Sequence, residues 1–63
     1  MKRRDLMKRL AEIAKLQGLE MRLTEGANHT KVVIGKRIDV VARHTEINEM
    51  TAKAIIRKME GRS

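Results

Sequence analysis

Residues 19–42 have the sequence LEMRLTEGANHTKVVIGKRIDVVA, and the residue pattern of this stretch specifies the central sheet of the protein. Its first part alternates apolar and polar residues, which predicts a half-buried strand over 19–24. Two further segments, 29–34 and 37–42, are rich in β-branched residues and predict two more strands. Short polar segments that contain Gly or Asn separate the three strands, as tight turns require. The stretch therefore predicts a three-stranded antiparallel meander.

Amphipathic helices are expected on both sides of this meander. Residues 3–17 repeat apolar side chains at helical spacing and end before Gly18, a typical C-terminal stop. Asn48 is a suitable N-cap for a second helix over 49–59. Because each helix has a single apolar stripe, both must cover the same face of the sheet. The sequence thus predicts an α+β fold, α-β-β-β-α, in which a three-stranded antiparallel sheet has two helices on one face and the other face is open.

The size and charge of the chain limit what it can do. Its 63 residues are expected to form a single domain, 1–63, with an aliphatic core, because there is no Phe, Trp or Tyr. Fifteen Lys and Arg against eight Asp and Glu give a net charge of +7, which favours a polyanionic partner such as nucleic acid or an acidic protein. Without aromatic rings to stack on bases, RNA would be bound through phosphate contacts, hydrogen bonds and shape.

Several classes of protein are not expected. The absence of Cys excludes a secreted disulfide framework. No apolar stretch is long enough to span a bilayer, and the basic start at residues 2–4 is not followed by a signal-peptide core. We therefore expect a cytoplasmic protein that does not contact the membrane. The two His and the scattered carboxylates do not have the spacing of a metal site, so neither metal nor another cofactor is expected.

The register of the strands can be predicted from the loops. If residues 25–28 form the first loop, Thr24 lies opposite His29. If residues 35–37 form a three-residue second loop, His29 lies opposite Arg43 on its other side. This register places His29 at the loop edge of the open face.

The same register determines the neighbours of His29 on the open face. Lys31 lies two residues along the strand, and Arg43 is directly opposite, so the imidazole is expected in a basic neighbourhood. Val33 and Val41 are expected on this face as well. An apolar spot on a basic surface suggests that a protein partner covers it.

His29 is the candidate catalytic residue. Histidine titrates near physiological pH, which suits it to remove the proton of a ribose 2′-hydroxyl. Lys31, Arg22 or Arg43 would then hold the phosphate, and metal-free cleavage would first give a 2′,3′-cyclic phosphate. His44 either completes an acid/base pair or lies at a strand end. The alternative for His29 is a solvated surface residue after a turn.

Three motifs carry a resemblance to a known family: GANHTK at 26–31, RHTEI at 43–47 and NEMTAKAII at 48–56. Together they resemble the HicA family of bacterial toxin mRNA interferases, over nearly the whole chain. The resemblance implies a fold like that of a double-stranded-RNA-binding domain, with His29 as the catalytic histidine. It further implies an endoribonuclease that cleaves mRNA and inhibits translation until a HicB antitoxin covers its active face.

The match has two departures from the family pattern. Ala27 replaces the usual serine before the histidine, and Ala42 stands where many members have proline. We expect Asn28 and His44 to contact RNA together with the three cations named above. Two other functions stay open, namely a non-catalytic module that binds structured RNA and a subunit whose basic face docks an acidic protein.

Overall fold

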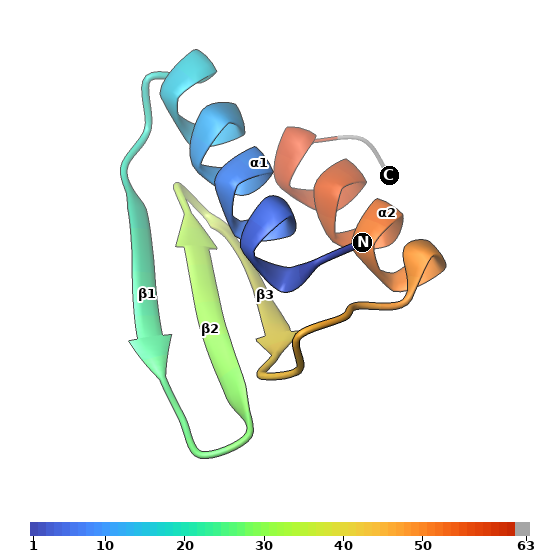
Figure 1. The fold of residues 1–63 in the computed structure, drawn as a ribbon. Helices are drawn as coiled ribbons and strands as arrows, with labels where there is room; N and C mark the ends of the chain where they lie inside the picture. Colours follow the sequence, from blue (N-terminus) through green and yellow to red (C-terminus); the bar gives the residue numbers. More distant parts are fainter. Residues whose placement is uncertain (62–63) are drawn as a thin grey trace.

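The computed structural model describes residues 1–61 of the chain, and Figure 1 shows its fold. The strands form one antiparallel sheet in the order β1-β2-β3, and both helices lie on the same side of it (Figure 1). The predicted α+β fold is confirmed. In chain order the elements are α1 Arg3–Leu16, β1 Met21–Glu25, β2 His29–Ile34, β3 Arg37–Ala42 and α2 Glu49–Glu60.

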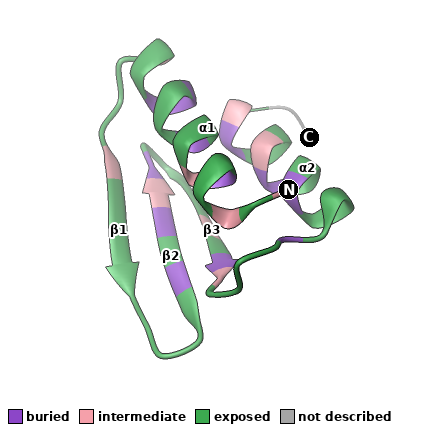
Figure 2. Ribbon diagram, viewed as in Figure 1, coloured by how far each residue is buried: buried purple, intermediate pink, exposed green. Residues whose placement is uncertain are grey.

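An aliphatic core fills the space between the helices and the sheet. Figure 2 shows buried residues on the sides of α1 and α2 that face the sheet, and at alternate positions of β2. The alternation follows from the pleat, which turns successive side chains of a strand to opposite faces. The buried apolar residues are Leu6, Leu10, Ile13, Ala14, Val32, Ile34, Val41, Ile47, Ala52, Ile55 and Met59.

Gly18 ends α1 and Asn48 begins α2, as the sequence predicts. Gly18, with a φ of 68°, turns the chain out of α1 in the left-handed conformation that glycine tolerates. At the start of α2, the side chain of Asn48 accepts hydrogen bonds from the backbone N–H groups of Met50, at 2.9 Å, and Thr51, at 3.4 Å. These two donors have no partner within the helix, so Asn48 acts as the expected N-cap.

The pairing of β1 with β2 differs from the predicted register by two residues. Thr24 lies opposite Lys31 instead of His29, and Glu25 lies opposite Thr30. The backbone N–H of Gly26 donates to the carbonyl of His29 at 2.8 Å, so the hairpin is tighter than expected. Because the shift is two residues, every side chain stays on its predicted face.

The pairing of β2 with β3 differs by one residue, and this inverts β3. His29 lies opposite Ala42, not Arg43, because the loop has two residues, Gly35 and Lys36, instead of three. Gly35 has a φ of 60°, and only glycines have a positive φ in residues 1–61, which fits a type II′ turn. Such turns match the twist of the paired strands. The predicted three-residue loop is therefore wrong.

The inversion exchanges the two faces of β3. Val41, predicted on the open face, is fully buried beneath the helices. Ile38 and Val40 lie on the open face instead, with 47% and 50% of their surfaces exposed. The apolar spot expected beside His29 is therefore present, but it consists of Ile38, Val40 and the half-buried Val33.

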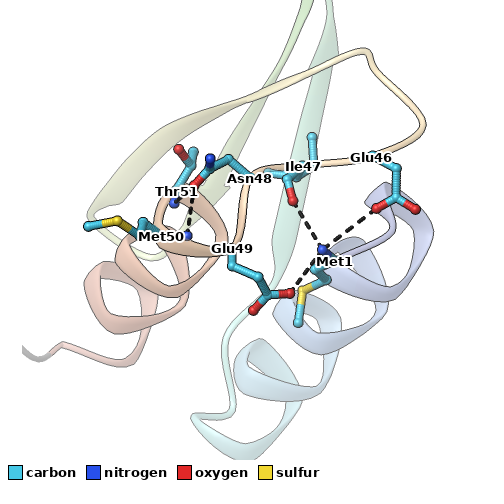
Figure 3. A network of polar contacts seen from close by, with 7 residues as sticks. All are labelled: Met1, Glu46, Ile47, Asn48, Glu49, Met50 and Thr51. Carbon is cyan, nitrogen blue, oxygen red and sulfur yellow. Dashed lines mark hydrogen bonds and ion pairs between the residues drawn. The ribbon is translucent and has the colours of Figure 1, made fainter.

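The first residues of the chain pair with the segment that precedes α2, as Figure 3 shows. The Ile47 N–H donates to the Met1 carbonyl at 2.8 Å. The Met1 amine donates to the Ile47 carbonyl at 3.1 Å and forms ion pairs with Glu49 at 2.9 Å and Glu46 at 3.7 Å. The hydrogen bond with Glu49 raises the pKa of the amine and lowers that of the carboxyl. These contacts fix the connection between β3 and α2.

Candidate functional site

The candidate site lies on the open face, which we define as the side of the sheet turned away from the two helices. Its β1 part and the first half of β2 are polar or basic, whereas Val33 of β2 and the β3 part are apolar. The two parts adjoin because β2 is the central strand. The open face consists of Arg22, Thr24, His29, Lys31, Val33, Ile38, Val40 and Ala42.

His29 is the first residue of β2 and is exposed on the open face. Its backbone is fixed, because it pairs with Ala42 and accepts a hydrogen bond from Gly26. The next residue, Thr30, is fully buried toward the helices, so the alternation of the strand directs the imidazole outward. Within residues 1–61 the ring forms no hydrogen bond or ion pair, so both of its nitrogens are accessible to a ligand.

Two predicted cations share this face. Lys31 is exposed and lies two residues from His29, a separation of about 7 Å along a strand. Arg22 lies opposite Val33, diagonal to Lys31, and its guanidinium pairs with the exposed Glu20 at 3.5 Å. Exposed pairs of this kind contribute little to stability and are readily exchanged for another anion. Lys31 is therefore the cation next to the imidazole, and Arg22 is farther along the same surface.

Arg43 does not lie beside His29 as predicted. Its backbone N–H donates to the carbonyl of Asn28 at 3.1 Å, which places it level with the loop. Its guanidinium donates to the carbonyl of Gly26 at 3.0 Å and pairs with Glu25 at 3.4 Å. The one-residue shift of β3 is the cause. Arg43 therefore bonds the loop before His29 and is not the cross-strand neighbour of the imidazole.

A polar chain behind the loop was not anticipated from the sequence. The hydroxyl of Thr30, fully buried, donates to Glu25 at 2.6 Å and accepts from the Arg3 guanidinium at 2.5 Å. Arg3 also donates through Nε to the carbonyl of Ala42 at 3.2 Å. This series of hydrogen bonds connects α1 to the ends of all three strands. The sequence did contain one indication of these hydrogen bonds. Thr30 alternates with Val32 on the buried face of β2, and a buried hydroxyl needs hydrogen-bond partners.

The two remaining predicted residues are placed near the same end of the sheet. Asn28 is exposed in the loop between β1 and β2. His44 is exposed in the bend after β3, and no hydrogen bond joins its ring to another described residue. His29 is therefore the imidazole placed on the open face, and the role of His44 as a partner in acid/base chemistry stays a prediction.

Two further findings concern residues 1–61 and bear on metal binding and on membrane insertion. No group of three His, Asp or Glu side chains gathers as a metal site would need. Neither α1 nor α2 has the length and apolar character needed to cross a membrane. Comparison of the chain with protein-family models, characterised proteins and solved structures finds no match.

Proposed function

We propose that this protein is a metal-independent endoribonuclease of the HicA type, with His29 as its general base. The observation that carries the proposal is the exposed, unpartnered imidazole of His29, on a rigid strand, with Lys31 beside it on an uncovered face. The net charge of +7 would draw the RNA backbone to the protein. The motif resemblance adds mRNA as the substrate and inhibition of translation as the consequence.

The proposed reaction is an internal transfer within the RNA. His29 removes the proton of a ribose 2′-hydroxyl, and the 2′-oxygen attacks the adjacent phosphorus. The bond from phosphorus to the 5′-oxygen breaks, and this oxygen takes a proton from the imidazolium or from water. Lys31 stabilises the negative charge that develops on the phosphoryl oxygens. The products are a 2′,3′-cyclic phosphate and a 5′-hydroxyl, and DNA, which has no 2′-hydroxyl, is not cleaved.

The open face also suggests how the activity is controlled. Ile38 and Val40 are about half exposed and adjoin the strand that carries His29. An apolar strip next to a catalytic group is suited to a protein that covers both. We propose that the HicB-type antitoxin implied by the resemblance binds there.

A second candidate function is a non-catalytic module that binds structured RNA. The observation in its favour is the position of Arg43, whose guanidinium bonds the loop. Of the three predicted cations, Lys31 is then the one next to His29, and a single cation gives less stabilisation of a reacting phosphate than two would. Against it, the first turn of α2 carries Glu49, which is engaged with the Met1 amine, and a carboxylate there repels phosphate. This candidate predicts salt-sensitive RNA binding without strand scission.

The two functions are separated by incubating purified protein with single-stranded and structured RNA in excess EDTA. His29→Ala is expected to lower the cleavage rate by about 10²–10⁴-fold, the usual contribution of a general base. Glu12→Ala is the control, because Glu12 is exposed on α1 and is not among the residues proposed to bind or cleave RNA. Equal cleavage by the wild type and His29→Ala, or cleavage only on addition of metal, would contradict the mechanism. Binding without cleavage would establish the second candidate.

A further inference from the structure

A groove of about 710 Å³ lies along α2, on the helix side of the sheet and away from the open face. Arg37 at the start of β3 forms one wall, and α2 supplies the rest. The residues of the groove fall into two kinds. The cationic ones are Arg37, Lys53, Arg57 and Lys58, and the apolar ones include Met50 and Ala54.

The positive charge of the groove is compensated only in part, because Lys53 acts on the nearby Glu49 carboxylate and, after the Met1 amine, helps to lower its pKa. In the described part of the chain, Arg37, Lys53 and Arg57 form no ion pair, and no carboxylate lines the groove. Lys58 has a partner at the limit of ion pairing, Asp39 at 4.0 Å. Several cations around one concave surface reinforce each other's potential, because the low-dielectric wall focuses it. The groove therefore attracts anionic groups.

The groove also has an apolar side that the fold does not use. Met50 is 81% exposed, and Ala54 is exposed one turn later on the same side of α2. The residues that attach α2 to the core, such as Ala52 and Ile55, lie on its other side. Exposed methionine is well suited to contact varied apolar groups because its side chain is flexible and polarisable. α2 thus presents an apolar row next to a cationic row formed by Lys53 and Arg57.

The wall formed by Arg37 is held in place by the end of α2. The chain leaves the helix at Gly61 with a φ of 88°, and a Cβ added there would come within 2.5 Å of Arg37 Nη2. The guanidinium therefore packs against the C-terminal end of α2, where the helix dipole favours positive charge.

We propose that this groove docks an acidic amphipathic segment of another protein. Carboxylates of the segment would pair with Lys53, Arg57 and Arg37, while its apolar side chains cover Met50 and Ala54, in the manner of a helix laid in a groove. A nucleic-acid backbone would form ion pairs with the cations, but it has no apolar group to cover Met50. The observations therefore favour a protein. This surface is separate from the open face, so docking does not depend on His29.

The test uses a synthetic helical peptide of about five turns, with Leu along one face and Glu elsewhere, and ¹⁵N backbone spectra of the full chain. The peptide is expected to shift the amide signals of residues 50–58 and Arg37 saturably. A peptide of the same composition with Leu scattered around the helix is expected to bind much more weakly. The double substitution Lys53→Glu and Arg57→Glu should weaken binding about tenfold or more, because two attractive pairs become repulsive.

The matched control variant is Lys8→Glu with Lys15→Glu, which changes the net charge equally on the exposed side of α1. This control is expected to change the affinity for the peptide by no more than about twofold, because it alters only the long-range attraction between the net charges of the two molecules. Equal weakening by both double variants, or equal binding of both peptides, would overturn the proposal. So would shifts at residues 50–58 caused by an RNA duplex but not by the acidic peptide. His29→Ala should bind the peptide as the wild type does, which separates this surface from the proposed active site.

Discussion

At the scale of single residues, Thr30 explains how His29 is both exposed and fixed. The Thr30 side chain is fully buried, and its hydroxyl bridges the Arg3 guanidinium and the Glu25 carboxylate. Glu25 is in turn paired with Arg43, which holds the carbonyl of Gly26. The backbone on both sides of the loop is therefore tied to polar partners. A rigid backbone at His29 positions the imidazole without any hydrogen bond to the ring itself.

Thr30→Val is expected to lower the free energy of unfolding by about 1–3 kcal/mol. Valine keeps the shape of threonine but removes the hydroxyl that bonds the charged side chains of Arg3 and Glu25, and hydrogen bonds to charged groups contribute about 1.5–3 kcal/mol. The measurement is urea denaturation followed by circular dichroism. Thr24→Val is the matched control, because Thr24 is exposed on the open face and the change there should stay within about 0.5 kcal/mol. Similar losses in the two variants would show that the buried hydrogen bonds contribute nothing.

The polar chain also shows what could not be predicted at this scale. The sequence placed Thr30 in a core position, but its partner Arg3 is 27 residues away. A contact over that distance depends on how α1 crosses the sheet, which no local pattern specifies. Conversely, His29, Lys31 and Arg22 are on the predicted face, because the periods of β1 and β2 are unambiguous and a two-residue shift preserves faces.

At the scale of secondary structure elements, the inversion of β3 is the main departure from prediction. The segment RIDVVA is apolar at 38, 40, 41 and 42, so its pattern fits burial of either face. The choice is made by the hairpin, where two loop residues and the positive φ of Gly35 specify a register that the strand itself does not. The residue ranges of β2 and β3 could be predicted from the sequence, but the register in which the two strands pair could not. The same shift moved Arg43 away from His29.

Gly35→Ala tests the hairpin that selects this register. Alanine is strained at a φ of 60°, and its Cβ would come within 2.8 Å of Leu19 Cδ1. We expect the variant to be destabilised by about 1–2 kcal/mol, the cost of a left-handed non-glycine residue. Thermal unfolding provides the measurement. Lys36→Ala, at the neighbouring loop position with an ordinary φ, is the control and should unfold within a few degrees of the wild type.

At the scale of the whole molecule, stability should depend on pH through the contact between Met1 and Glu49. The folded-state pKa of the Met1 amine is raised above 8.0, so its contribution is present below pH 8 and is lost as pH rises through the raised value. The pKa of Glu49 is lowered below 4.5, so its contribution is present above that pH and is lost under more acidic conditions. Stability from this pair is therefore greatest between about pH 5 and 8.

Denaturation midpoints measured from pH 4 to pH 10 would check this dependence. In Glu49→Gln the decrease in stability above pH 8 should be smaller than in the wild type, because the amine loses the nearer of its two carboxylate partners and keeps only Glu46. Glu12→Gln is the control, since Glu12 is an exposed carboxylate of α1 far in sequence from the pair. An unchanged alkaline slope in Glu49→Gln would contradict the assignment.

The half-exposed Ile38 and Val40 have a further consequence, which concerns how copies of the protein behave toward one another. They lie on an edge strand, whose free backbone groups and apolar side chains form a template for aggregation. The net charge of +7 opposes this by mutual repulsion, but added salt screens that repulsion within about 10 Å at 0.1 M. Colloidal stability should therefore fall as ionic strength rises. Light scattering against salt concentration would detect this, and Val40→Lys should suppress it.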